Sequence, residues 1–239
     1  MPLMSTNAIE ARRALARVTQ AIVRCERCTR LRSYCRQIAR DKKAAHRLDT
    51  YWGRPVPGFG DPQARILILG LAPAAHGANR TGRVFTGDGV GASGDFLMAA
   101  LHRAGFANIS TSQHPDDGLR LDDVYIAAAV RCAPPGNKPL PSEIAACADH
   151  LAAEVAALPR LRLVVALGKI AWDAWLNHLA HRGVPLRPRP AFSHGSVVDV
   201  PGSSMLVGMF HPSRQNTNTG KLTASMYDTV FDEVKKRLR

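Results

Sequence analysis

The chain has 239 residues, 46% of them hydrophobic, which is enough for a folded domain with a substantial core and excludes an intrinsically disordered protein. A net charge of +13 indicates a polyanionic partner such as nucleic acid. Apolar runs shorter than the ~20 residues that span a bilayer, and an N-terminus without a signal-peptide core, predict a cytoplasmic protein with no membrane partner. In that reducing setting cysteines more often bind metal or react than form disulfides.

The N-terminal segment, residues 1–50, is expected to be helical. Apolar residues recur at helical spacing over residues 9–25, which predicts a helix there. Residues 29–50 are very basic and are expected to continue as helical or irregular surface. Proline and glycine then predict a loop over residues 51–60.

Four short apolar runs in the remaining chain are typical of buried strands: residues 65–71, 124–130, 161–167 and 205–210. Helical patterns separate or follow them at residues 93–104, 142–158, 169–179 and 222–238. A small edge strand is expected within residues 192–200. This alternation predicts an α/β fold in three layers, with a central four-stranded, mainly parallel sheet flanked by helices. Without a repeat or linker, residues 1–239 are expected to form a single domain.

Two polar loops directly follow predicted strands. The first, residues 70–88, is rich in glycine and alanine, and the second, residues 211–216, reads His-Pro-Ser-Arg-Gln-Asn. In open α/β sheets ligands bind beyond the carboxyl ends of the strands, so both loops are expected to open onto one cleft. A flexible backbone, an aromatic ring, an amide and an imidazole that face one another would suit a flat base and a phosphate.

Four of the five cysteines form a plausible ligand set. Cys25 and Cys28 make a C-x2-C pair, and Cys132 and Cys147 supply two further thiols. Four thiolates from distant segments could close a tetrahedral site, for which zinc is the better candidate on the residues alone. Such a site would tie the N-terminal helical segment to the sheet. Cys35 is left over and is expected to be a surface or packing thiol.

These segments together resemble the uracil-DNA glycosylase superfamily, and most closely its family 5, the iron–sulfur type-b enzymes. The match comprises residues 70–88, 130–139 and 211–216 with the paired cysteines, and three such segments in this order are specific. The resemblance implies a monomeric DNA repair enzyme that flips out and hydrolytically excises uracil from DNA. It also favours a structural [4Fe–4S] cluster over zinc, since four cysteines suffice for one.

The same resemblance assigns a pocket for the flipped base. Phe85 matches the ring that stacks on the base, although an ordinary core phenylalanine is the alternative. The backbone of Gly70, Leu71 and Ala72 is expected to approach the base's carbonyl edge. Ala128 stands where family 4 has an asparagine that reads uracil. The absence of that asparagine predicts a wider range of excised bases, which includes hypoxanthine and ethenocytosine.

The predicted catalytic groups lie in the two loops. His211 is expected to donate a hydrogen bond to the base's carbonyl oxygen as the glycosidic bond breaks. Leu71 occupies the place of a carboxylate or amide in sister families and cannot orient water. Asn79 is the first candidate to position water, followed by Asp88, which could also cap the next turn, and then His76. No lysine occupies a recognisable nucleophile position, so no strand cleavage is expected.

The second loop is also the predicted grip on DNA. Ser213 is expected to contact a phosphate, and Asn216 continues a polar loop whose amides can meet the backbone. Arg214 and Gln215 would enter the duplex and fill the gap that the flipped nucleotide leaves. Further phosphate contacts, with ordinary surface charge as the alternative, are predicted for Arg54, Arg80, Arg83 and Lys138.

Two other classes of function remain open on the sequence. Leu71, in place of a polar catalytic residue, favours a non-catalytic nucleic-acid-binding protein on the same scaffold. A cluster-based electron carrier would account for the cysteines but would leave the second loop and the positive charge unexplained.

Overall fold

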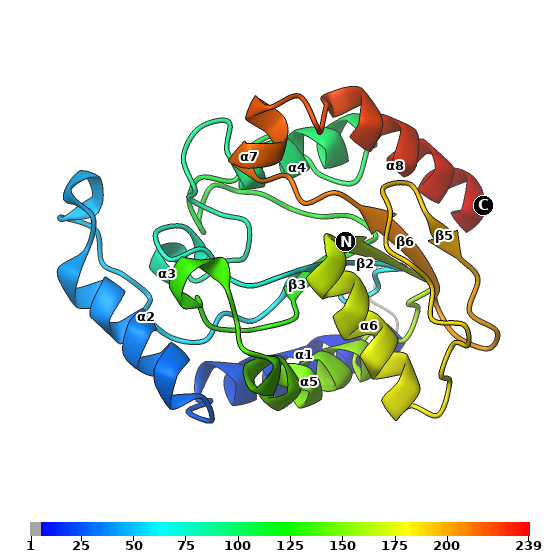
Figure 1. Ribbon diagram of the computed structural model, residues 1–239, viewed down its shortest axis with the longest axis horizontal. Coiled ribbons are helices and arrows are strands. Elements are labelled where there is room, and N and C mark those ends of the chain that lie inside the picture. The colour runs from blue at the N-terminus through cyan, green and yellow to red at the C-terminus, as the bar shows by residue number, and fades with distance from the viewer. Residues whose placement is uncertain (1–5) are drawn as a thin grey trace.

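Four parallel strands form the centre of the sheet in the computed structural model, which describes residues 6–239 (Figure 1). Their spatial order is β3, β2, β4, β6, and nearly every residue in them is buried, as expected for strands covered on both faces. The four strands predicted from apolar runs are confirmed: β2 (Ile66–Gly70), β3 (Val124–Ala128), β4 (Leu163–Leu167) and β6 (Met205–Met209).

Two very short antiparallel strands flank this parallel centre. β1 (Phe59–Gly60) pairs with β3, and β5 (Val197–Val198) pairs with β6. The edge strand expected within residues 192–200 is therefore confirmed. β1 instead falls in a segment predicted to be a loop, because two residues are too few to produce an alternating pattern.

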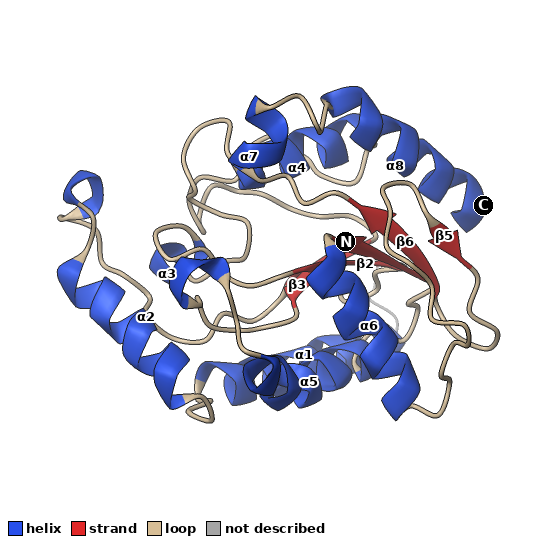
Figure 2. Cartoon of the chain, in the orientation of Figure 1, coloured by secondary structure: helices blue, strands red, loops and turns tan. Residues whose placement is uncertain are grey.

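Helices cover both faces of the sheet (Figure 2). Ile66 and Ile68 of β2 face α4 and α8, whereas Leu67 and Leu69 face α1, α5 and α6, as the alternation of side chains along a strand requires. The predicted three-layer arrangement is thus confirmed. The helices of the outer layers are α4 (Ser93–Arg103) and α8 (Ala224–Leu238) on one face, and α1 (Thr6–Val23), α5 (Pro141–Ala156) and α6 (Lys169–His181) on the other.

α2 (Thr29–Asp41) lies beyond one edge of the sheet, at the left of Figure 1. Its buried residues Leu31 and Cys35 pack against Cys132 and Cys147, which belong to the loop after β3 and to α5. α2 is therefore attached to the rest of the chain by a small core of its own. No helix within residues 6–239 combines the length and apolarity needed to cross a membrane.

Several one-turn helices lie in the connecting loops. Three of them follow the carboxyl ends of β2, β3 and β6, and a fourth follows α2. They escape sequence prediction because a single turn has no periodic apolar pattern. They are α3 (Ala78–Thr81), η2 (Pro135–Asn137), α7 (Arg214–Asn218) and η1 (Ala44–His46).

Candidate active site and cysteine cluster

A cavity of about 650 Å³ opens at the carboxyl ends of the central strands. The loops after β2, β3 and β6 all contribute to its wall, as the topology predicts. The predicted site residues that line it are Leu71, Ala72, His76, Phe85, Asp88, Ala128, His211, Ser213 and Arg214. Residues more than one hundred positions apart in the chain therefore share one hollow.

The rings of Phe85 and His211 meet in this cavity. Their centroids are 5.8 Å apart and their planes are inclined by 29°, so the two rings stack. Phe85 has a φ of 52°, a left-handed conformation that is unusual for a bulky residue and that marks a strained functional position. Gly70 lies beneath the ring, where a Cβ atom would come within 2.9 Å of Phe85. Gly70 thus makes room for Phe85 and does not itself line the cavity.

Hydrogen bonds fix the backbone of His211 and of the preceding residue, Phe210. The His194 Nδ1 atom accepts from the Phe210 amide at 3.1 Å, and the Tyr227 hydroxyl donates to the Phe210 carbonyl at 2.7 Å. The side-chain amide of Asn216 donates to the backbone carbonyl of His211 at 2.8 Å. Burial lowers the pKa of His211 to about 4, so its imidazole is neutral at pH 7. A neutral ring can still donate one N–H hydrogen bond to a carbonyl oxygen.

Asp88 supplies a carboxylate to the same cavity. Desolvation raises its pKa to about 6, against the opposing effect of the Arg214 and Arg80 guanidiniums. The carboxylate lies against the backbone of Gly77, where a Cβ atom would collide with the Asp88 Oδ1 atom. A carboxylate with this pKa is largely ionised at pH 7 and remains basic enough to accept a proton from water.

Asn79 lies apart from the cavity, contrary to its rank as first candidate for positioning water. Its side chain is fully buried, and the Nδ2 atom donates to the carbonyls of Cys35 at 3.3 Å and Ala75 at 3.4 Å. The one-turn helix α3 turns this amide towards α2. His76 does line the cavity, where its Nδ1 atom lies 3.0 Å from the Tyr51 hydroxyl. Of the three candidates for positioning water, Asp88 and His76 therefore line the cavity and Asn79 does not.

The loop after β6 begins with a helix cap. The Ser213 hydroxyl accepts from the backbone N–H of Asn216 at 3.3 Å, and so caps the start of α7. Ser213 and Asn216, both expected on phosphates, therefore make contacts within the loop that shape it. Arg214 and Gln215 are exposed at its tip, and Arg214 also lines the cavity.

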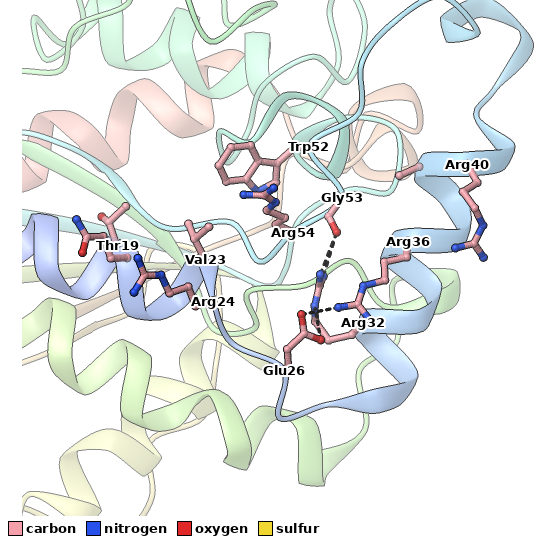
Figure 3. Close-up of a pocket in the computed structure, with 12 residues that line it drawn as sticks. Thr19, Val23, Arg24, Glu26, Arg32, Arg36, Arg40, Trp52, Gly53 and Arg54 are labelled. Carbon is pink, nitrogen blue, oxygen red and sulfur yellow. Dashed lines mark hydrogen bonds and ion pairs between the residues drawn. The ribbon is translucent and has the colours of Figure 1, made fainter.

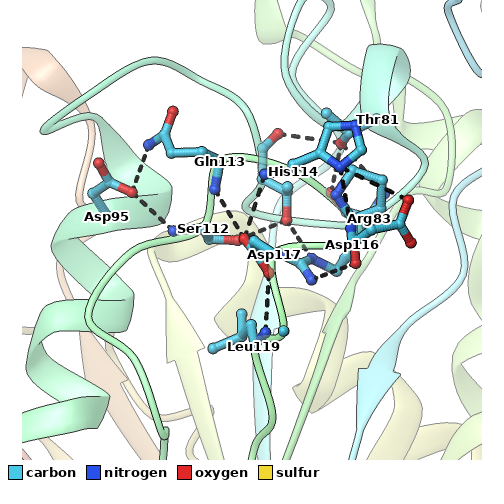
Figure 4. A network of polar contacts seen from close by, with 12 residues as sticks. Thr81, Arg83, Asp95, Ser112, Gln113, His114, Asp116, Asp117 and Leu119 are labelled. Atoms are coloured by element: carbon cyan, nitrogen blue, oxygen red, sulfur yellow. Dashed lines mark hydrogen bonds and ion pairs between the residues drawn. The ribbon is translucent and has the colours of Figure 1, made fainter.

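Arg80 and Arg83 are structural residues, although they were predicted to contact phosphates. Arg83 is only 9% exposed and donates to Asp117 at 2.7 Å and to Ser112 at 3.1 Å, in the polar network of Figure 4. Arg80 pairs with Asp49 at 2.8 Å. These two guanidiniums hold the loop that carries Phe85, so their positive charge is used inside the protein.

The four predicted ligand cysteines are neighbours and free thiols. Burial, followed by the proximity of Cys28 and Cys25, raises the pKa of Cys147. Contact with Cys35, burial and the proximity of Cys147 raise the pKa of Cys132. Cys35 itself is fully buried, with its Sγ atom 3.6 Å from the Ala133 carbonyl oxygen, so it is a packing thiol and not a surface one.

The cysteines do not surround a single point closely. Within residues 6–239, no three His, Cys, Asp or Glu side chains are arranged to hold one metal ion. A tetrahedral zinc site needs four sulfurs about 2.3 Å from the metal, so the zinc alternative has no ready-made site here. A four-iron cluster is wider, because each thiolate binds a different iron.

Comparison with known proteins decides the family. The profile of the uracil DNA glycosylase superfamily matches residues 57–235. The chain belongs to this superfamily. It is 50% identical to the type-5 uracil-DNA glycosylase of Thermus thermophilus over 91% of this chain and 95% of that protein. It is 49% identical to the type-5 uracil-DNA glycosylase of Mycobacterium tuberculosis, over 89% and 77% of the two chains. The resemblance inferred from the loops and cysteines is confirmed.

Type-4 members of the superfamily are more distant. The type-4 uracil-DNA glycosylase of Archaeoglobus fulgidus is 36% identical over 48% of this chain and 49% of its own. The type-5 protein of Pyrobaculum aerophilum is 46% identical over 88% and 87%. The higher identity and coverage place this superfamily member with the type-5 enzymes.

Among the cavity residues of this superfamily member that sequence reasoning missed, three come from the N-terminal segment. Tyr34, Lys43 and His46 come from α2 and the turn that follows it, and they line the side of the cavity towards the N-terminal segment. The only sequence signal was the basic character of residues 29–50. Their place depends on how that segment packs against the loop after β3.

Proposed function

We propose that this protein is a monofunctional DNA glycosylase that excises uracil from DNA by hydrolysis. The observation that carries the proposal is the stacking of Phe85 against His211 in a cavity at the carboxyl ends of the strands. The names of the type-5 relatives, uracil-DNA glycosylases, support the same reaction. As part of this proposal, the enzyme acts as a monomer in the bacterial cytoplasm, where chromosomal DNA would be its substrate.

The chemistry follows from the charges in the cavity. An everted base packs on Phe85, and the neutral His211 ring donates to the base's carbonyl oxygen. As the bond between the base nitrogen and C1′ breaks, its electron pair leaves with the base, and the sugar becomes cationic. A water oxygen then bonds to C1′, while its proton passes to the Asp88 carboxylate. The base anion afterwards takes a proton from solvent, and an abasic site remains.

A wider substrate range is part of the proposal. Leu71 and Ala128 present apolar surface to the cavity, and Ala128 offers no side-chain group to read a base edge. Hypoxanthine and ethenocytosine should therefore be excised as well as uracil. Excision rates on matched duplexes carrying each lesion test this, and a strict preference for uracil contradicts it.

The test of the main proposal is a duplex with one uracil, incubated with enzyme and then with alkali. The wild type should produce a cut strand, and His211→Ala should bind the duplex with unchanged affinity but excise about 10²–10³-fold more slowly. No adduct should form on DNA with borohydride. Binding without excision by the wild type would favour the non-catalytic alternative.

We also propose that Cys25, Cys28, Cys132 and Cys147 hold a structural [4Fe–4S] cluster. The fit rests on four free thiols that lie close enough together for several of them to raise the pKa of a neighbouring thiol. When bound, the cluster would cross-link the start of α2 to the sheet and to α5. Anaerobically purified protein should contain about four irons and absorb near ~400 nm; colourless protein with bound zinc contradicts the proposal.

A further inference from the structure

A second hollow of about 810 Å³ lies between the end of α1, one face of α2 and residues 52–54 (Figure 3). We call it the arginine groove, defined by Arg24, Arg32, Arg36, Arg40, Trp52 and Arg54. Five guanidiniums and one carboxylate, that of Glu26, line it. Such an excess of like charge attracts an anion to the groove.

The single carboxylate is already in use. Glu26 lies 3.4 Å from the Arg32 Nε atom and 2.6 Å from a terminal nitrogen of Arg36. Arg32 is 4% exposed and also donates twice to the Gly53 carbonyl. Arg24, Arg40 and Arg54, by contrast, have no ion-pair partner within the described part of the chain. In Figure 3, Arg24 and Arg40 stand at opposite ends of the groove.

Trp52 provides a rigid aromatic platform in the groove. Its indole rests on Gly82, where a Cβ atom would come within 2.9 Å of the ring, and its Nε1 atom donates to the Pro55 carbonyl at 3.1 Å. The ring is still 37% exposed. The Arg54 guanidinium lies 5.8 Å from its centroid, an arrangement that leaves the guanidinium edge free to bind phosphate.

The groove and the base cavity lie on opposite faces of α2. Arg32 and Arg36 face the groove, whereas Tyr34, two residues from each and therefore about 200° around the helix, lines the cavity. The Trp52 backbone N–H also donates to the carbonyl of Arg80, in α3, at 2.8 Å. The two hollows are thus separated by roughly one helix diameter, about 10–12 Å. Duplex DNA centred on the cavity extends past that distance within a few base pairs.

We propose that the arginine groove is a second DNA-binding surface, which holds the phosphate backbone that flanks the everted nucleotide. The inference extends the proposed glycosylase function to a longer stretch of substrate. Guanidinium forks beside an exposed indole suit phosphates and bases. The position of the groove beside the base cavity favours the backbone of the same duplex over an acidic protein segment. Arg54, which the sequence predicted to contact phosphate, is part of this surface.

The test compares the wild type with the triple variant Arg24→Gln, Arg40→Gln, Arg54→Gln. Fluorescence anisotropy measures binding to duplexes of 10 and 30 base pairs that share a central sequence, at several salt concentrations. For the longer duplex, the variant should bind about tenfold more weakly at moderate salt. Its log–log salt slope should be shallower by about 2–3, one unit per lost phosphate contact. Binding of the shorter duplex should not change.

A matched control removes three exposed arginines elsewhere, with Arg160→Gln, Arg182→Gln and Arg187→Gln. Equal weakening by this control would show a mere effect of net charge and overturn the proposal. Unchanged binding of the longer duplex by the groove variant would also overturn the proposal. If that variant instead lost the ability to bind poly-glutamate, the groove would be assigned to an acidic protein. Thermal unfolding confirms that each variant folds.

Uracil excision from the shorter duplex by the wild type keeps the two proposals separate. If no excision occurs, the proposed function fails whatever the binding result. If excision occurs and the groove variant binds the longer duplex normally, only the second surface fails.

Discussion

The Asp88 carboxylate lies half-buried in the cavity, where desolvation raises its pKa from 3.8 to about 6. A carboxyl that binds its proton more tightly in the folded state stabilises the fold below pH 3.8, and that stabilisation is lost as the pH rises through 6. The shift corresponds to at most about 3 kcal/mol, since one pKa unit is worth about 1.4 kcal/mol. The group proposed to act on water is therefore a cost to stability at neutral pH.

Asp88→Asn should raise the free energy of unfolding by about 1–3 kcal/mol at pH 7, with the gain absent below pH 4. The wild-type excision rate should rise through pH 6 as Asp88 ionises. The same change should slow excision about 10²–10⁴-fold and remove that rise. Urea unfolding and single-turnover excision across pH 4–8 measure both. Asp232→Asn, at an exposed position, is the control and should change neither. A variant that keeps the wild-type pH profile would remove Asp88 from the mechanism.

Tyr227 acts on the site through Phe210, the residue before His211. Its hydroxyl donates to the Phe210 carbonyl, and its ring is fully buried in the core between α4, α8 and the sheet. Tyr227→Phe should cost about 1–2 kcal/mol of stability by leaving a carbonyl unpaired. Because His211 then loses part of its support, excision should slow at least several-fold while the DNA dissociation constant stays constant.

Tyr125→Phe is the matched control for this prediction. Tyr125 is also buried, and its hydroxyl donates to Glu154 at 3.2 Å on the opposite face of the sheet. The control should lose similar stability and keep the wild-type excision rate. Equal slowing of excision by both variants would show that Tyr227 is only a core residue.

Among the secondary-structure elements, a buried ion pair links the loop after β3 to α5. Arg131 and Glu154 approach to 2.6 Å, and both side chains are 1% exposed. Glu154→Gln should cost about 3–5 kcal/mol, because it leaves a guanidinium buried without a counter-charge. Asp228→Asn breaks the exposed pair between α8 and Arg103 of α4 and should cost at most about 1 kcal/mol. Thermal unfolding measures the stability of the two variants. Equal losses of stability would contradict the expectation that the buried pair matters more than the exposed one.

The central strands were predictable because burial on both faces leaves an uninterrupted apolar run, such as Ile66–Gly70. The meeting of Phe85 and His211 was predictable for a related reason, since parallel strands end at one edge. Asn79 was misplaced because a single helical turn has no sequence signal, and that turn decides where the amide points. Arg83 was misread because its partners Ser112 and Asp117 lie about thirty residues away, beyond any local pattern.

At the scale of the whole molecule, the N-terminal segment completes both hollows. One face of α2 contributes Tyr34 to the base cavity, and the other contributes Arg32 and Arg36 to the arginine groove. Within this segment, α2 is held by the small core around Leu31 and the cysteines and by polar contacts, among them the ion pair between Arg30 and Glu143 at 2.8 Å. The proposed cluster would therefore govern both surfaces through the position of one helix.

Removal of the cluster should thus loosen the segment and leave the sheet intact. After iron is chelated, amide hydrogen exchange should quicken across residues 29–46 and remain slow in β2, β3, β4 and β6, since the two large cores do not include the cysteines. Binding of the 30-base-pair duplex should weaken when the iron is removed. The variant Cys147→Ser should reproduce this pattern without a chelator, and Cys35→Ser, at a thiol outside the ligand set, should retain iron. Exchange that quickens evenly across the sheet would show instead that the cysteines stabilise the whole fold and do not tether one helix.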